Sequence, residues 1–368
     1  MTKLKEEDYT FESSFDGTGP LYALAVCPKN AGNSPIRVLM CGYSGTRDRV
    51  RSSAVHMAGH GYFCICVEIR GHGDSAGKQD DSGLEIMDIY DGIQSAGRRY
   101  GELVDMSKIS IAGYSGGGGN VYFAVLKFPF LFRGAITFFG ISDYGMWGRL
   151  YQRYRPYIEA NVGGSLEEVA QKYMVRNAAL AAGNLSGTRF HIAYDQEETI
   201  CPKVMNTMFF NAAKERGYEN IFVHESRKED KDRWLHKKMQ ADGHLCPMED
   251  VFMHDLASSG PDALVMPMAG ALTVLGFIVT PKFKCVLRKG DDAVATVEYD
   301  FGQTEAWMDI VPVTATQDCV GELTLAADLF AQSRQVIING RKTATTTPGA
   351  ETPIAIRGRS TVLLKPDK

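Results

Sequence analysis

The sequence predicts an α/β protein in which helices flank a mostly parallel β-sheet, with a helical cap insertion and a small C-terminal β-sandwich-like domain. Three observations predict this fold class. Over the first two thirds of the chain, short apolar runs alternate with stretches of helical spacing, as in a parallel sheet covered on both faces. Residues 140–187 interrupt this alternation without a clear strand. After about residue 260, short β-type runs follow one another with turn signals between them.

The elements of the α/β part follow from their periodicity. Apolar runs short enough for strands lie at residues 9–15, 21–27, 36–41, 62–69, 109–112, 133–139, 188–194 and 221–225. Apolar residues recur at helical spacing at residues 48–60, 84–100, 117–127 and 204–217. Within the insertion, Ser165 followed by Glu168 fits a capping box at a helix start.

The last hundred residues predict a small antiparallel β-domain. Its β-type runs lie at residues 274–279, 284–288, 293–300, 307–313, 322–326, 336–338 and 353–364. Asn339-Gly340 is a strong hairpin signal, and residues 343–349 are expected to form a loop. The uncharged segment 264–280 is barely long enough to span a bilayer and contains Pro267, Gly270 and Gly276, so we expect a buried strand there.

Length and composition predict a soluble two-domain protein, with a catalytic domain at 1–260 and a β-rich domain at 261–368. Lys and Arg number 40 against 44 Asp and Glu, so no basic excess favours nucleic-acid binding. The N-terminus lacks the apolar segment of a signal peptide, and the eight cysteines are few for the length. We therefore expect a cytoplasmic protein with reduced thiols and no membrane partner; assembly into a homo-oligomer stays open.

The sharpest local motif is the glycine-flanked serine in Gly113-Tyr114-Ser115-Gly116-Gly117, which follows the strand at 109–112 and opens a helix. This is the G-x-S-x-G pattern in the context that makes a nucleophile elbow. Glycines are needed where the turn is too tight for side chains, and the helix N-terminus offers free N–H groups to an oxyanion. The motif predicts Ser115 as nucleophile and the Gly116 N–H as one oxyanion donor. The run of glycines at 116–119 indicates close backbone packing or room for a bound acyl group.

Four spaced features together resemble the α/β-hydrolase superfamily over about residues 9–258. They are the Ser115 turn, CGYSG at 41–45 after a strand, RGHGDSAG at 70–77 after the next strand, and a late ADGH at 241–244. Within the superfamily the sequence is similar to the prolyl oligopeptidase, X-prolyl dipeptidyl peptidase and cocaine-esterase groups.

The resemblance implies the remaining catalytic roles. It makes His244 the general base and Tyr43 the second oxyanion donor, through its N–H or its phenol. For the triad acid, Glu198 lies four residues before Pro202, as in relatives, whereas Asp195 directly follows the strand. Glu198 and Asp195 both remain candidates for the triad acid, and Asp143 is a third, less favoured candidate.

The predicted activity is acyl transfer to water on a small-molecule carboxylic ester, without metal or organic cofactor. The alternatives are a peptidase or amidase of prolyl oligopeptidase type and a non-catalytic binding protein on the same scaffold. His56 and His60 share a helix face but lack a neighbouring carboxylate, so no metal site is expected. Tyr114, Tyr144 and Trp147 are predicted to bind substrate, although the rings of the insertion could instead pack it onto the sheet.

Overall fold

In the computed structural model, eight strands form one mixed sheet that carries the N-terminal part of the chain. The structure describes residues 3–230, 264–287, 292–302, 305–313 and 319–366. The strand order is β1-β2-β4-β3-β5-β6-β7-β8. β1 and β2 pair antiparallel, as do β2 and β4, and all later pairs are parallel. The strands are β1 (Leu4–Phe11), β2 (Leu21–Pro28), β3 (Ser34–Met40), β4 (Phe63–Glu68), β5 (Val104–Tyr114), β6 (Phe132–Phe138), β7 (Arg189–Asp195) and β8 (Ile221–Ser226). The predicted fold class is confirmed.

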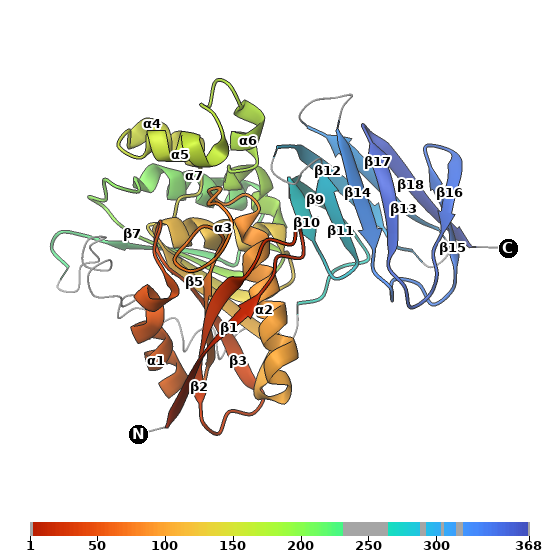
Figure 1. Cartoon of the computed structure of the whole chain (residues 1–368). Coiled ribbons are helices and arrows are strands. Elements are labelled where there is room, and N and C mark those ends of the chain that lie inside the picture. The colour runs from red at the N-terminus through yellow and green to blue at the C-terminus, as the bar shows by residue number, and fades with distance from the viewer. Residues whose placement is uncertain (1–2, 231–263, 288–291, 303–304, 314–318, 367–368) are drawn as a thin grey trace.

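Helices cover both faces of this sheet, and α1 and α2 lie on opposite sides of the strands (Figure 1). α2 buries Ile86, Ile89 and Ile93 on one face and leaves Arg98 and Arg99 in its last turn, as an amphipathic surface helix does. The helices are η1 (Arg47–Val50), α1 (Arg51–Gly59), α2 (Glu85–Tyr100), η2 (Gly101–Leu103), α3 (Gly116–Lys127) and α7 (Lys203–Glu215).

The insertion between β6 and β7 is helical, as predicted, and lies above one end of the sheet (Figure 1). It contains α4 (Tyr144–Leu150), α5 (Arg155–Val162), α6 (Ala170–Met174) and η3 (Ala178–Leu185). The capping box forms, because the Ser165 N–H donates to the Glu168 carboxylate over 2.9 Å and the Glu168 N–H to Ser165 Oγ over 3.3 Å. It closes an isolated turn, however, and the next helix begins only at Ala170.

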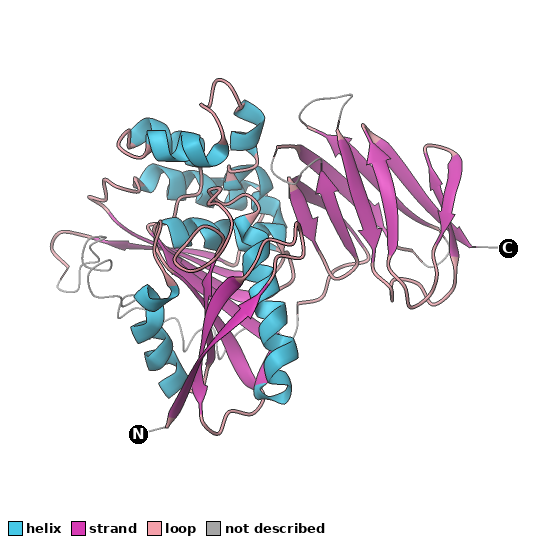
Figure 2. Cartoon of the chain, in the orientation of Figure 1, coloured by secondary structure: helices cyan, strands magenta, loops and turns pink. Residues whose placement is uncertain are grey.

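The C-terminal part is a ten-stranded antiparallel sheet with the order β16-β15-β18-β13-β12-β9-β10-β11-β14-β17. Side chains from strands far apart in this order share one core, so the sheet folds back on itself as a sandwich (Figure 2). Its strands are β9 (Ala269–Leu275), β10 (Phe277–Val279), β11 (Phe283–Leu287), β12 (Val294–Asp300), β13 (Ala306–Pro312), β14 (Val320–Leu325), β15 (Arg334–Ile338), β16 (Arg341–Thr345), β17 (Thr352–Arg357) and β18 (Ser360–Pro366).

Several sequence-based boundaries are wrong, and three of them have a clear structural reason. The first strand begins at Leu4 rather than residue 9, because this edge strand exposes charged side chains that break the apolar run. β16 occupies part of the predicted loop, as the second strand of the Asn339-Gly340 hairpin. The run predicted at 353–364 is two strands, which turn at Gly358 with a φ of 61°.

The C-terminal sheet packs directly on the α/β part. The Asn184 side chain binds the Thr273 backbone twice, donating to its carbonyl over 2.6 Å and accepting from its N–H over 2.9 Å. Phe277 is fully buried between the two parts, against Phe15 and Phe128, with Lys127 Nζ 4.3 Å from its ring centre. Segment 264–280 thus supplies β9 and β10 to this interface. Among the described residues, no helix has the length and apolar character needed to cross a membrane.

Candidate active site

Ser115 stands at a strained turn between β5 and α3. Its φ of 54° and ψ of −122° lie outside the regions that side-chain-bearing residues ordinarily occupy. Hydrogen bonds on both sides hold this conformation: the Ser115 N–H donates to the Phe138 carbonyl, and the Gly119 N–H donates to the Ser115 carbonyl. Backbone strain of this kind persists only where the surroundings enforce it, and it is concentrated at functional sites.

The glycines around Ser115 are required by close packing. A Cβ on Gly117 would lie 2.2 Å from the Cys41 carbonyl oxygen, and one on Gly113 would lie 2.4 Å from the Gly117 oxygen. A Cβ on Gly118 would meet Thr137 Oγ1 at 2.7 Å. The turn therefore sits directly on the end of β3, which brings the 41–45 loop to the serine.

Tyr43 lies against the residue that follows the serine. A Cβ on Gly116 would be 2.8 Å from both the backbone nitrogen and the Cα of Tyr43. The loop is fixed by a turn from the Gly45 N–H to the Gly42 carbonyl and by a positive φ of 55° at Ser44. The Tyr43 phenol points away into the insertion, where Asn161 Nδ2 donates to it over 2.8 Å. Of its two predicted donors, the Tyr43 N–H is the one beside Gly116.

The two leading candidates for the triad acid have different surroundings. Asp195 is buried at the end of β7, where it accepts a hydrogen bond from Ser226 Oγ over 2.7 Å and one from the Glu197 N–H over 2.9 Å. Glu198 is half-buried and accepts from the N–H groups of Ile200 and Cys201. Because Cys201 Sγ lies 3.9 Å from Ser115 Oγ, the loop that Glu198 stabilises reaches the serine.

Asp143, the third candidate, caps α4: its carboxylate accepts from the Met146 N–H over 2.9 Å, and burial raises its pKa. Cys201 was not singled out from the sequence. Burial raises the pKa of its thiol, so it stays neutral beside the serine.

The predicted base, His244, lies outside the described residues. His72, in the RGHGDSAG loop, is buried, and its Nδ1 lies 2.9 Å from the Gly45 carbonyl; burial lowers its pKa. The rings of His56 and His60 contact each other at 4.7 Å between centres. Within the described ranges, no group of three His, Cys, Asp or Glu side chains could hold a metal ion.

The RGHGDSAG motif stabilises its own loop through hydrogen bonds to α2 and β4. Arg70 is buried and bonds both oxygens of Asp88 on α2, over 2.7 and 2.9 Å. Ser75 Oγ donates to the Glu68 carbonyl over 2.6 Å, and a Cβ on Gly73 would lie 2.5 Å from the Glu68 carboxylate. The motif therefore fixes the loop after β4, which faces the Tyr43 loop.

The three predicted substrate-binding rings are all buried. Trp147 is 1% exposed, and its Nε1 donates to the Ile200 carbonyl over 2.7 Å. Tyr144 is also 1% exposed, and its hydroxyl lies 3.1 Å from Ser82 Oγ. Tyr114, at 4% exposed, packs its ring under Gly42. The rings thus form the wall behind Tyr43, and a direct contact with substrate remains a prediction for each.

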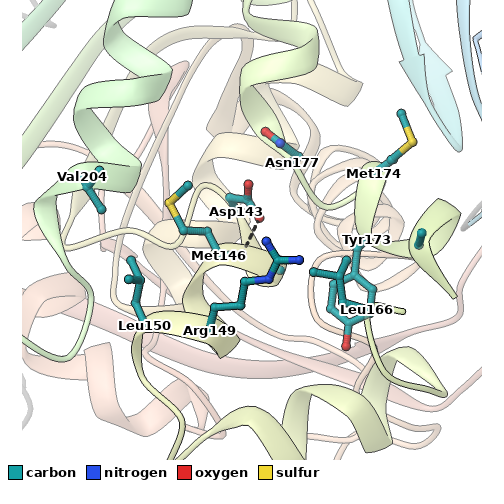
Figure 3. A pocket seen from close by; sticks show the side chains of 11 residues that line it. Asp143, Met146, Arg149, Leu150, Leu166, Tyr173, Met174, Asn177 and Val204 are labelled. Atoms are coloured by element: carbon teal, nitrogen blue, oxygen red, sulfur yellow. Dashed lines mark hydrogen bonds between the residues drawn. The ribbon is translucent and has the colours of Figure 1, made fainter. Parts of the chain in front are cut away.

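α4 separates this wall from a pocket in the insertion. Tyr144 and Trp147 contact Ser82 and Tyr43, respectively. Met146, Arg149 and Leu150, also on α4, line a pocket of about 510 Å³ (Figure 3). Its other walls are largely apolar and come from the loop before α6, from α6 and from the start of α7: Leu166, Ala170, Tyr173, Met174 and Val204. The volume is in the range of small-molecule sites.

Comparison with known proteins places this geometry in a family context. Residues 49–217 match the model of the prolyl oligopeptidase family. No curated protein sequence matches the chain.

Solved structures with similar folds include peptidases. An acylaminoacyl peptidase in complex with Z-Gly-Gly-Phe-chloromethyl ketone is 18% identical over 73% of this chain and 43% of its own, with a TM-score of 0.57. The acylaminoacyl peptidase of Pyrococcus horikoshii is 20% identical over 70% of this chain and 43% of its own, also with a TM-score of 0.57. A puromycin hydrolase is 15% identical over 72% of this chain and 42% of its own, with a TM-score of 0.56.

The present chain therefore spans less than half the length of these proteins. At such identities the likeness establishes the fold alone. The chain has the α/β-hydrolase fold, and its residues 49–217 are similar to the prolyl oligopeptidase family.

Proposed function

We propose that this protein hydrolyses an acyl bond through a covalent intermediate on Ser115. The observation that carries the proposal is the strained Ser115 backbone with Tyr43 packed on the next residue. The backbone nitrogen of Tyr43 lies close to Gly116, and the N–H groups of these two residues are the proposed oxyanion donors. Removal of one such oxyanion donor typically lowers kcat about 10²- to 10³-fold.

The proposed reaction has two half-steps. Ser115 Oγ attacks the carbonyl carbon while His244 takes the hydroxyl proton, and the resulting oxyanion accepts from the Tyr43 and Gly116 N–H groups. The tetrahedral intermediate collapses, the leaving group takes the proton from His244, and an acyl-serine ester remains. Water then attacks that ester, His244 accepts its proton, and the acid is released as Ser115 regains its proton.

Glu198 is the proposed triad acid. A triad carboxylate orients the imidazole and stabilises its cation. Glu198 sits on the loop that carries Cys201 to the serine, and it follows the register set by Pro202. Asp195, in contrast, is held by Ser226 on the neighbouring strand.

Two classes of substrate bond are proposed. The sequence-based prediction is a carboxylic ester, in which the leaving alcohol needs little protonation. The family match and the peptidases among similar folds favour a peptide or amide bond at least as strongly. An amide requires His244 to protonate the leaving amine, so the two bonds make different demands on the same residues.

Parallel assays on purified protein separate these candidates. We expect a fluorophosphonate probe to label the wild-type protein and not Ser115→Ala. The control Ser107→Ala removes an exposed hydroxyl on the same strand. Short p-nitrophenyl esters and aminoacyl nitroanilides then report ester and amide cleavage. Labelling that persists in Ser115→Ala contradicts the proposal, and turnover of nitroanilides with negligible ester cleavage selects the peptidase candidate.

A further inference from the structure

The side chain of Tyr43 is anchored at the end far from the serine. Asn161 on α5 donates through Nδ2 to Tyr43 Oη over 2.8 Å and to Asp81 Oδ1 over 3.1 Å. The Asn161 amide thus links the Tyr43 phenol to the fully buried Asp81 carboxylate, which also interacts with the phenol directly. Burial, and next the negative charge of Asp81, raise the pKa of the phenol, so it stays a neutral hydrogen-bonding group.

The loop that supplies Asp81 is itself strained. Asp81 and Ser82 have φ values of 52° and 64°, two consecutive non-glycine residues in the left-handed region. The Ser82 N–H donates to the Glu85 carboxylate over 2.7 Å, and Ser82 Oγ donates to Asn120 Oδ1 over 2.9 Å. This conformation costs about 1–3 kcal/mol per residue and is held by its surroundings. This strained loop conformation holds the Asp81 carboxylate next to the Tyr43 phenol.

Aromatic contacts complete the enclosure of the Tyr43 ring. Trp147 on α4 and Tyr154 at the start of α5 both meet it edge-on, with centres 5.5 Å away. Three of the four groups that hold Tyr43 therefore come from the helical insertion. The backbone of the same tyrosine borders the nucleophile at Gly116.

We propose that Asn161, with Asp81 behind it, is a positioning residue that fixes Tyr43 so that its N–H faces the oxyanion. This inference rests on the proposed function, since it concerns the same site. Asn161 acts through Tyr43, and its role is to hold the donor in the geometry of the transition state. Displacement of a catalytic group by about 1 Å lowers rates by up to about 10²-fold. The helical insertion thereby sets the oxyanion hole from α5, 118 residues along the chain from the tyrosine.

The test is a double-mutant cycle on ester or amide turnover. Asn161→Ala and Tyr43→Phe both remove the Asn161–Tyr43 hydrogen bond, and Tyr43→Phe also removes the bond of the phenol to Asp81. We therefore expect Asn161→Ala to lower kcat about tenfold and Tyr43→Phe to lower it at least as much, with KM within about twofold for both. The double variant should be no slower than Tyr43→Phe alone. The isosteric Asn161→Asp lacks the donor and adds a charge beside Asp81, so it should be slower than Asn161→Ala. Arg153→Ala, a change of an exposed side chain just before the same helix, should leave kcat unchanged.

The other possible outcomes distinguish failure of the Asn161 role from failure of the proposed function. Unchanged kcat in Asn161→Ala, a rise in KM alone, or fully additive losses in the double variant overturn the inference while Ser115-dependent turnover of the wild type stands. Absence of Ser115-dependent turnover in the wild type overturns the proposed function, and the inference with it. A fluorophosphonate labelling rate measured on each variant shows whether the nucleophile itself is intact.

Discussion

At the scale of single residues, the candidate site combines the strained Ser115 with Tyr43, whose backbone contacts Gly116 and whose phenol binds Asn161. The Ser115 backbone is fixed by Phe138 and Gly119, and Tyr43 by Gly116 at its backbone and Asn161 at its phenol. The reacting groups therefore do not depend on solvent-exposed side chains for their placement. Such preorganisation is what electrostatic stabilisation of an oxyanion requires.

The two acid candidates give a first prediction. Glu198→Gln keeps an oxygen that can accept the Ile200 and Cys201 N–H groups but removes the charge, so kcat should fall about 10²- to 10⁴-fold with little loss of stability. Asp195→Asn is the matched control and should keep most of the activity. Steady-state kinetics on both variants decide the matter. A larger loss of kcat in Asp195→Asn would reverse the assignment.

Asp81 gives a pH-dependent prediction for stability. Burial, the largest cause, raises the pKa of its carboxyl to about 7 from the usual 3.8. Between these values the unfolded chain releases the proton that the folded chain retains, so stability falls as pH rises from about 4 to about 7. Asp81→Asn should remove on the order of 1–3 kcal/mol of this decline. Free energies of unfolding at pH 5 and pH 8 test this, and an equal decline in both proteins contradicts it.

At the scale of elements, the junction between β5 and α3 illustrates how packing selects residues. Glycine inside a helix is ordinarily unfavourable by about 1 kcal/mol. At Gly117, however, any side chain would meet the Cys41 carbonyl oxygen at 2.2 Å. The helix start and the end of β3 can approach only because the side chain is missing.

This approach predicts the effect of Gly117→Ala. The added methyl group must push α3 from β3, so we expect a loss of about 1–3 kcal/mol in the free energy of unfolding and a lower kcat. Gly32→Ala is the control, because a Cβ there meets nothing within 4 Å. Urea denaturation compares the two. Equal stability of both variants contradicts the packing account.

The sequence predicted most elements but not all of their ends. Buried strands such as β3 and β4 can be recognised in the sequence as apolar runs, because both of their faces are covered. β1 carries Lys5, Glu6 and Glu7 at the sheet edge, so composition hides its start. The Ser165 and Glu168 pair forms its two hydrogen bonds without a following helix, since the motif stabilises a turn as well as a helix start.

The sequence names residues of the candidate site only where their signal is local. Ser115 and Gly116 follow from one motif after one strand, and Tyr43 from a resemblance. Asn161 and Asp81 have no signature of their own, because their role arises from contacts between segments far apart in the chain. Long-range packing of this kind cannot be read from periodicity.

At the scale of the whole molecule, the two sheets are joined by direct packing and hydrogen bonds. The Asn184 side chain hydrogen-bonds both the N–H and the carbonyl of Thr273, as a neighbouring strand would. Phe277 packs against Phe128 at the end of α3. The interface includes Lys127 at the C-terminal end of α3, the helix that begins next to Ser115. The C-terminal sheet is therefore expected to support the catalytic part rather than to act apart from it.

Phe277→Ala tests that support. Removing a fully buried ring should lower stability by about 3–5 kcal/mol and also remove the contact with Lys127 Nζ. Val320→Ala, at an exposed position of the same sheet, should change stability by less than about 0.5 kcal/mol. Thermal unfolding, followed with one spectroscopic signal for strands and one for helices, measures the stability of both parts. Loss of the C-terminal transition alone, with the α/β part unaffected, contradicts a supporting role.

The central claim is that an acyl group passes through the oxygen of Ser115. Rapid acid quenching during turnover, followed by mass analysis of the intact chain and its peptides, tests this most directly. We expect a mass increase equal to the acyl group on the peptide that contains Ser115, and no such increase in Ser115→Ala. An acyl adduct on any other residue, or continued turnover by Ser115→Ala, would contradict it.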